Sequence, residues 1–599
     1  MTRPPVVRTG RRALIAVTLA LLAGGVATPT VAAPSAPPVT DPSASSEWPC
    51  SDWGMYGRTP ARTFAAECEA AALSPSTAPT LVPEWFFKTP KTVTASPAVV
   101  DGVVYVGDWS PTMYALDAAT GDVIWQRAIP PAPFAPFGPI VSSAAVTDVR
   151  TGAATRRLVI FGAGPRLFAL DARDGSTVWQ LSVAGGEEGE ETEIESSPVV
   201  WKGIVYVGMD THNQPEEQTG GARGGLLAVD AATGDLLWKF EPDHAGQSGC
   251  ASIWSSPTID AARGHVIAAT GNCPHPDYDW GPYQEAVFAL DLRTGAPRWS
   301  FQPHEPNLDD VDFGSTPNLF RDADGREILG IGNKDARYYA LDPATGEQLW
   351  AAQVAEPGNV RENFAIGGFI GSTAAGGGRV FGGTALGGPP YYHALDASSG
   401  DIAWQGPAGP TYAASAYVNG VVIAGALDDT LRVYDAATGV VLSALPLTGP
   451  ISSGPAVAGD RVFIGTGTSS SDACAKEVPG SDLCLEFFET VLGGLGGVHS
   501  LRVLAGGGTS GGDSSTGSGT GSSSGSGGSG SSGTTGPTTG SSGSSGTQGG
   551  SAGSATGAQT TSGVAPGGAG TIPETGAQSL PLFGAGAAAI AALLRRRRH

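Results

Sequence analysis

A repeat that runs from residue 80 to residue 504 constrains the fold more than any other feature of this 599-residue chain. Each copy has an apolar stretch ending in Asp, a Gly four residues later and usually a Trp four residues after the Gly. Asp side chains accept backbone N–H groups where a tight turn begins, and Gly adopts the positive φ that closes it. The pattern therefore predicts a β-hairpin with Trp on its second strand. The copies are Asp117/Gly121/Trp125, Asp171/Gly175/Trp179, Asp230/Gly234/Trp238, Asp291/Gly295/Trp299, Asp342/Gly346/Trp350, Asp396/Gly400/Trp404 and Asp435/Gly439, where Ser443 replaces the Trp.

The other half of each repeat begins with Ser-Pro or a similar pair and continues as a second hairpin. The eight starts are Ser96, Ser143, Ser197, Ser256, Ser315, Ser372, Ser415 and Ser453. Two hairpins make a four-stranded antiparallel unit, and a single such sheet cannot bury both of its faces. Radial stacking of the units solves this problem. The sequence thus predicts an all-β fold, an eight-bladed β-propeller of four-stranded antiparallel blades.

The two ends of the repeat are complementary. The eighth unit ends at 498–503 without a Trp strand, whereas Leu81 to Lys88 contains Trp85 and precedes the first complete unit. We therefore expect this N-terminal strand to complete the last blade and close the ring. An open ring would leave two long unpaired strand edges, which favour aggregation.

Residues 1–33 have the pattern of a secretory signal peptide, with a basic region, an apolar stretch and small residues before Ala33. Cleavage near Ala27 is the alternative, because Pro34 disfavours a cut after Ala33. The pair Arg11-Arg12 also leaves twin-arginine export open, and an uncleaved N-terminal anchor is a further alternative. A lead-in segment, 34–79, connects this signal to the propeller at 80–504.

The C-terminal region has three parts. Residues 505–570 are almost wholly Gly, Ser, Thr and Ala, which is typical of a disordered tether. Segment 571–599 follows, with the pentapeptide at 572–576, an apolar run at 577–594 and four arginines. This order resembles the sortase sorting signal of Gram-positive surface proteins. The resemblance implies transient membrane insertion through 577–594, cleavage between Thr575 and Gly576, and covalent attachment to cell-wall peptidoglycan. A plain single-pass membrane anchor is the alternative.

Charge and cysteine content narrow the function further. The net charge of −22 argues against sequence-independent binding of nucleic acid, which requires clustered Lys and Arg.

Six cysteines in an exported chain favour disulfides. Their spacing suggests local pairs, although other pairings stay open: Cys50 with Cys68, Cys250 with Cys273, and Cys474 with Cys484. The sequence contains no Cys-x-x-Cys-His, the attachment motif of c-type haem.

The repeat, together with the lead-in 52–58 and the motifs at 107–110 and 114–117, resembles the pyrroloquinoline-quinone (PQQ) dehydrogenase propellers, in particular their polyvinyl-alcohol-dehydrogenase-like branch. The resemblance implies an oxidoreductase that uses PQQ and Ca²⁺ on an alcohol, polyol or polymer and passes electrons to a separate acceptor. A non-catalytic binding or scaffold propeller on the cell surface is the rival interpretation. It is favoured by one departure, since this chain lacks the adjacent cysteine pair that covers the quinone in alcohol dehydrogenases of the family.

The resemblance also implies a site on the propeller axis. Calcium prefers hard oxygen ligands and would polarise the quinone as a Lewis acid, while a carboxylate would take the alcohol proton. The implied calcium ligands are Glu195 and Asn272, and the implied floor of the quinone ring is Trp254. The base is Asp312 or Asp309, and Lys334 faces the quinone oxygens. Each of these residues also has a simpler interpretation, such as a turn former or a solvated acid.

Overall fold

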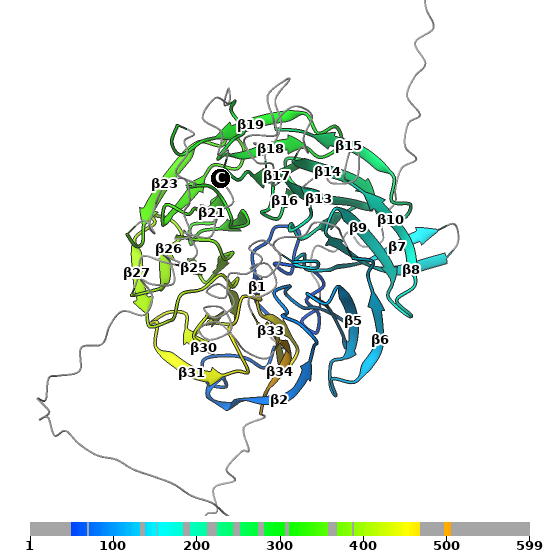
Figure 1. The fold of residues 1–599 in the computed structure, drawn as a ribbon. Helices are drawn as coiled ribbons and strands as arrows, with labels where there is room; N and C mark the ends of the chain where they lie inside the picture. Colours follow the sequence, from blue (N-terminus) through cyan, green and yellow to red (C-terminus); the bar gives the residue numbers. More distant parts are fainter. Residues whose placement is uncertain are drawn as a thin grey trace, which may run out of the picture.

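The computed structural model describes residues 49–68, 71–131, 138–151, 154–183, 192–211, 224–242, 252–272, 281–305, 311–356, 368–385, 389–467 and 496–504. Their strands form eight sheets arranged in a ring, and each sheet contains a blade of four antiparallel strands. Figure 1 looks along the ring axis, and in blade four the strands β16, β17, β18 and β19 follow one another from the inside to the rim. The predicted eight-bladed propeller is therefore confirmed.

The strands are assigned to blades as follows. Blades one to four comprise β3 (Ala98–Val100), β4 (Val103–Asp108), β5 (Thr112–Asp117), β6 (Val123–Ala128); β7 (Ala145–Thr151), β8 (Ala154–Ala163), β9 (Arg166–Asp171), β10 (Thr177–Ser182); β12 (Val199–Trp201), β13 (Ile204–Thr211), β14 (Gly225–Asp230), β15 (Leu236–Phe240); and β16 (Thr258–Asp260), β17 (His265–Ala269), β18 (Val287–Asp291), β19 (Pro297–Phe301). Blades five to eight comprise β20 (Asn318–Arg321), β21 (Glu327–Gly332), β22 (Arg337–Leu341), β23 (Gln348–Gln353); β24 (Ala374–Gly376), β25 (Arg379–Gly383), β26 (Tyr392–Asp396), β27 (Ile402–Gly406); β28 (Ala416–Val418), β29 (Val421–Gly425), β30 (Thr430–Asp435), β31 (Val441–Pro446); and β32 (Ala456–Ala458), β33 (Arg461–Thr466), β34 (Gly497–Val503), β2 (Leu81–Lys88). Three short elements complete the described structure: β1 (Ala65–Ala66), β11 (Thr192–Glu193) and the 3-10 helix η1 (Ala78–Thr80).

The ring closes as the sequence predicts. Strand β2 pairs antiparallel with β34, from Leu81 opposite Val503 to Lys88 opposite Gly497. Side chains fasten the same junction, because Glu84 forms an ion pair with Arg461 Nε at 2.7 Å. The outer strand of blade eight thus comes from the opposite end of the repeat, beside β34 in Figure 1.

Tryptophan and glycine of the repeat meet across neighbouring blades. Each indole N–H donates to a backbone carbonyl of the next blade, for example Trp179 to Ala231 O at 2.9 Å. The repeat glycine of that next blade lies against the same indole: a Cβ on Gly234 would come within 2.7 Å of Trp179. Ser443 replaces Trp in blade seven because blade eight has no hairpin turn there to receive it, since its outer strand is β2.

A belt of hydroxyl groups explains the serine at the blade starts. The N–H of one start donates to the hydroxyl of the next blade's start, as Ser143 N does to Ser197 Oγ at 3.0 Å. The belt acceptors are Ser143, Ser197, Ser256, Thr316, Ser372 and, across the closure, Ser96. In blade five the acceptor is Thr316, the residue after the predicted start Ser315.

The lead-in runs through the centre of the ring. Its backbone carbonyls accept N–H groups from the innermost strands of blades two, four, five, six and seven: Val146 to Gly54, Ile259 to Pro60, Leu319 to Ala61, Ala375 to Thr63 and Tyr417 to Phe64. Strand β1 adds in parallel to β28 of blade seven. The lead-in therefore pairs with strand edges that would otherwise face an open channel.

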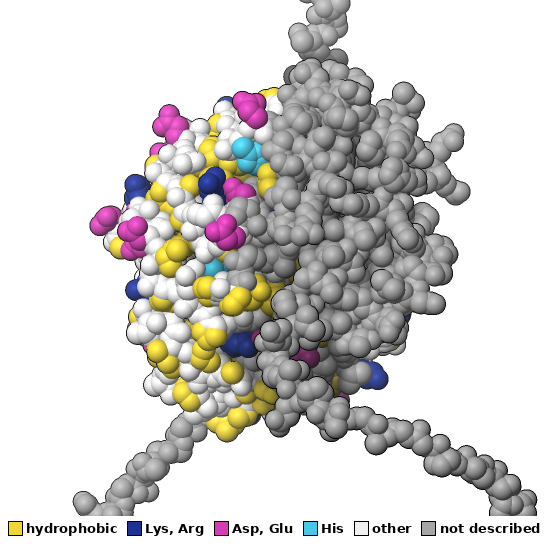
Figure 2. Space-filling model, turned by 60° about the vertical axis from the view of Figure 1, so that its left-hand side comes forward, with side chains coloured by type: hydrophobic (Ala, Val, Ile, Leu, Met, Phe, Trp, Pro, Cys, Tyr) yellow, Lys and Arg dark blue, Asp and Glu magenta, His cyan; other side chains and the backbone are white. Residues whose placement is uncertain are grey.

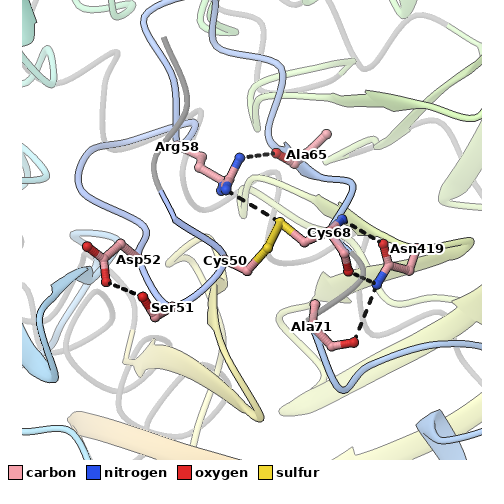
Figure 3. The surroundings of a disulfide bond; sticks show 8 residues. All are labelled: Cys50, Ser51, Asp52, Arg58, Ala65, Cys68, Ala71 and Asn419. Atoms are coloured by element: carbon pink, nitrogen blue, oxygen red, sulfur yellow. Dashed lines mark hydrogen bonds between the residues drawn. A yellow bond between two sulfur atoms is a disulfide. The ribbon is translucent and has the colours of Figure 1, made fainter. Parts of the chain in front are cut away.

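A disulfide between Cys50 and Cys68 closes this segment on itself, which confirms one predicted pairing. Figure 3 shows Asn419 beside it, donating from its side chain to Cys68 O and accepting from Cys68 N. The pairs Cys250–Cys273 and Cys474–Cys484 lie outside the described residues, as do the signal peptide, the tether and the sorting signal. In the described ranges no helix has the length and hydropathy needed to span a membrane.

Figure 2 shows one side of the ring. In the described part of this face, Lys and Arg side chains lie singly among acidic and uncharged residues, without a continuous basic band.

Candidate axial site

Four of the predicted site residues lie at one end of two neighbouring blades. Trp254 precedes β16, Asn272 follows β17, Asp312 precedes β20 and Lys334 follows β21. The first two strands of a blade are antiparallel, so the start of one and the end of the other reach the same mouth of the ring. Blades four and five thus bring these residues together.

The centre of the group is a buried ion pair. Lys334 Nζ lies 2.8 Å from Asp312 Oδ1, and the residues are 7% and 1% exposed. The other carboxylate oxygen, Oδ2, accepts the backbone N–H of Asn272 at 2.8 Å. Lys334 Nζ also lies over Trp254, 5.1 Å from the ring centroid, a geometry in which a cation attracts the indole face.

Two glycines permit this close packing. A Cβ on Gly314 would stand 2.1 Å from the indole of Trp254, and one on Gly271 would stand 3.1 Å from Asp312 Oδ2. The backbone therefore lies directly against the indole and the carboxylate. Neither glycine was predicted as a site residue, although both flank residues that were.

Burial and charge extend the group to a residue that the sequence did not reveal. Burial raises the pKa of the Tyr412 hydroxyl, and the nearby positive charge of Lys334 opposes that rise. Tyr412 lies between blades six and seven, far from Lys334 in the sequence and outside any motif. Only the closed ring brings it to this mouth.

Blade three supplies carboxylates beside the same mouth. Glu195 is half-buried between β11 and β12, and Glu193 is fully buried opposite Asp210 in the β11–β13 ladder. Ser252 Oγ donates to Asp210 Oδ1, and Ser252 O accepts the N–H of Gly271 at 2.7 Å. These contacts connect blade three to the segment that carries Asn272. Asp210 and Ser252 were not predicted from the sequence.

The residues present fit the chemistry of a planar quinone. The half-buried Trp254 offers a flat aromatic ring, and the buried Asp312 and Lys334 beside it supply a carboxylate and a cation. In the described residues no three His, Cys, Asp or Glu side chains form a group that could hold a metal ion. The predicted calcium site has only one such residue, Glu195, together with Asn272, so this finding does not test it. That calcium would be held by Glu195 and Asn272 remains a prediction, and Asp309 lies outside the described residues.

Comparisons with known proteins show which families this sequence resembles. The profile of the PQQ family described as "Glucose/ethanol/alcohol dehydrogenase, beta-propeller domain" matches residues 73–363. That of the outer membrane protein assembly factor BamB matches 334–475.

Two relatives are similar over most of their length. A polyvinylalcohol dehydrogenase of Sphingopyxis sp. (strain 113P3) is 28% identical over 536 residues, covering 75% of this chain and 77% of that protein. Another from Pseudomonas sp. is 28% identical over 465 residues, covering 66% and 70%. The dehydrogenase subunit of a quinone alcohol dehydrogenase from Gluconacetobacter polyoxogenes is 30% identical over 299 residues, covering 42% of this chain and 39% of that protein.

Solved structures share the architecture. A europium-containing methanol dehydrogenase superimposes with a TM-score of 0.61 at 17% identity, covering 76% of this chain and 98% of that one. The quinohemoprotein alcohol dehydrogenase from Comamonas testosteroni gives 0.59 at 20% identity, covering 76% and 80%. At these identities the likeness shows the fold alone.

Proposed function

We propose that this chain, whose propeller is similar to the PQQ-dependent dehydrogenase β-propellers, is an oxidoreductase that dehydrogenates an alcohol, a polyol or a hydroxyl-bearing polymer. The observation that carries the proposal is the buried Lys334–Asp312 ion pair beside the accessible indole of Trp254. A scaffold propeller has no need for a buried charge pair at the ring mouth, because burying two charges costs free energy.

Each of these residues has a role in the proposal. PQQ, when bound, supplies the two-electron acceptor for alcohol oxidation. The indole of Trp254 offers a flat surface for a planar ring. Asp312 accepts the proton of the substrate hydroxyl; the Asn272 N–H and Lys334 Nζ hold its carboxylate in place. The Lys334 ammonium is also available to carbonyl oxygens of the cofactor.

The relatives support a choice of substrate class. Two of them are named as polyvinylalcohol dehydrogenases and are matched along more than two thirds of their length. We therefore assign this chain a secondary alcohol, carried by a polymer or a small polyol, as its substrate. The electrons must pass to a separate acceptor, since the sequence has no c-type haem motif.

The export and sorting patterns complete the proposal. Residues 1–33 direct the chain out of the cell, and 571–599 direct it to sortase, which joins Thr575 to peptidoglycan. The enzyme would then act at the cell surface on substrates too large to enter the cell.

Cofactor binding tests the function directly. Purified protein is titrated with PQQ in the presence of Ca²⁺, following tryptophan fluorescence and then dye reduction with a secondary alcohol. We expect binding at micromolar PQQ. Asp312→Asn should retain binding and lose at least 100-fold in turnover, because removal of a general base costs about that factor or more.

Asp322→Asn is the matched control. Asp322 is a buried aspartate of the same blade that pairs with Arg326 at 3.0 Å, away from the site. This variant should lose stability but keep turnover per folded molecule. If the wild-type protein binds no PQQ at tens of micromolar, the oxidoreductase proposal is wrong and the surface scaffold replaces it.

A further inference from the structure

Arg62 is a fully buried arginine in the lead-in, with 0% of its surface exposed. Its guanidinium donates to three backbone carbonyls: Pro257 O at 3.0 Å, Ser197 O at 2.8 Å and Tyr56 O. In the described residues no carboxylate pairs with it. Burial lowers its pKa to about 9. The protein therefore keeps a costly buried cation whose bonds are all to main-chain oxygens.

The carbonyls that Arg62 binds belong to the segments that carry the axial site. Ser197 lies two residues after Glu195, at the start of blade three, and Pro257 lies three residues after Trp254, at the start of blade four. One planar guanidinium thus spans two adjacent blades. An ammonium group is a single point charge and cannot reproduce this fork of donors.

The main chain of Arg62 extends the connection to blade five. Asn318 Nδ2 donates to Arg62 O, and Leu319 N donates to Ala61 O at 2.9 Å. Asn318 begins β20, six residues after Asp312. Arg62 adopts a φ of +55° at this point, a left-handed conformation that costs a non-glycine residue free energy and persists only where surrounding contacts fix it.

We propose that Arg62 is a positioning residue for the axial site, which sets the spacing of the blade starts that carry Glu195, Trp254 and Asp312. The Cys50–Cys68 disulfide supports it by closing the segment in which it lies. Arg62 contacts none of these three side chains in the described structure, so it acts through the backbone of the inner strands. The inference rests on the proposed function only through the choice of PQQ as a probe.

The variants are Arg62→Lys and, as a matched control, Arg58→Lys. Arg58 is also a buried arginine of the lead-in with a positive φ, but it donates to Ala65 O and Cys68 Sγ, inside the segment. Both variants should lower the melting temperature. Well below that temperature, Arg62→Lys should weaken PQQ binding with Ca²⁺ at least tenfold, whereas Arg58→Lys should stay within twofold of wild type.

A second measurement requires no cofactor. Acrylamide quenching of Trp254 is obtained as the difference between each protein and its Trp254→Phe counterpart. We expect at least a 1.5-fold higher quenching constant in Arg62→Lys and no change in Arg58→Lys. A wild type that binds no PQQ would contradict the proposed function, and the quenching would still decide this inference.

The inference is overturned if Arg62→Lys lowers the melting temperature but leaves both PQQ affinity and Trp254 quenching at wild-type values, because Arg62 would then be a structural clamp only. If Arg62→Lys does not fold, Asn318→Ala replaces it, since that change removes the bond from blade five to Arg62 O. Unaltered Trp254 quenching and cofactor affinity in Asn318→Ala would equally overturn the inference.

Discussion

At the scale of single residues, the contact between Trp and Gly is the unit that joins blades. The sequence predicts both residues by their spacing within one blade, but their contact is made between blades, as Trp238 with Gly295 shows. Spacing along the chain therefore predicts the hairpin, and only the closed ring reveals what the indole touches.

Replacing Gly295 with alanine tests this contact. Gly295 has a φ of +68°, and its Cβ would stand 2.7 Å from Trp238. Gly264 has a φ of +69° with nothing within 4 Å, so Gly264→Ala isolates the backbone penalty of about 1–2 kcal/mol. Gly295→Ala should cost an additional ~1–3 kcal/mol from overpacking. Urea unfolding midpoints measure both. Equal losses of unfolding free energy in the two variants would show that the indole of Trp238 moves aside without an energetic cost.

Two buried histidines predict an acid limit to stability. Burial lowers the pKa of His393 and His499 to about 4, from an ordinary 6.5. The unfolded chain binds protons at these residues between pH 6.5 and 4 while the folded protein does not, so stability falls as pH falls through this window. From pH 7 to pH 5 each should cost about 2 kcal/mol. His393→Gln and His499→Gln should each flatten the pH dependence of urea unfolding. A profile as steep as that of wild type would contradict this assignment.

The axial residues show where sequence reasoning ends. Trp254, Asp312 and Lys334 were assigned by resemblance, and the structure places them in contact. Tyr412 and Asp210 belong to other blades and have no spacing signature. A site assembled from the ends of strands in several blades leaves no continuous pattern in the sequence. Only the residues that stand in motifs resembling those of the PQQ dehydrogenase propellers were therefore predictable.

At the scale of elements, strand β2 decides whether the ring is closed. Its Trp85 has the same role as the other repeat tryptophans, donating to Ala118 O of blade one at 3.2 Å. The sequence predicted this strand because both ends of the repeat were incomplete in complementary ways. The course of the lead-in was not predictable, because residues 50–68 have no periodicity. Their hydrogen-bond partners are set by the order of the blades around the closed ring, which the local sequence does not encode.

Deleting Leu81 to Lys88 should open the ring. The deletion removes the ladder partner of β34 and exposes the edge of that strand, so we expect aggregation or rapid proteolysis. Glu84→Gln is the milder companion, because it weakens the pair with Arg461 without removing the strand, and it should remain monomeric. Light scattering and limited trypsin digestion distinguish the cases. A monomeric deletion variant with the wild-type melting temperature would show that β2 is dispensable for closure.

At the scale of the whole molecule, the lead-in and the axial site occupy different parts of the ring. The lead-in pairs with the inner strands along the axis. Trp254 and Asp312 precede the first strands of blades four and five, and Lys334 follows the second strand of blade five, so they lie at one mouth of the ring. The lead-in joins the inner strands of several blades by backbone hydrogen bonds, and the axial site is built on the ends of the first two strands of blades four and five. Under the proposed function, a polymer substrate would approach from the mouth that carries Trp254, and surface attachment would have to leave that mouth open.

The predicted sorting signal at 571–599 provides the last prediction. As a random coil, residues 505–570 would span roughly 40–50 Å, which separates the propeller from an attachment point at Thr575. The apolar run 577–594 is rich in Gly and Ala and short for a permanent anchor. We therefore expect mature protein to end at Thr575 and to be released by wall hydrolases rather than detergent.

Thr575→Ala should move it from the wall to the membrane or medium, while Thr571→Ala, outside the pentapeptide, should leave it in the wall. Mass spectrometry of native protein measures the end directly, and an intact tail of Arg595 to His599 would replace wall attachment with a single-pass membrane anchor.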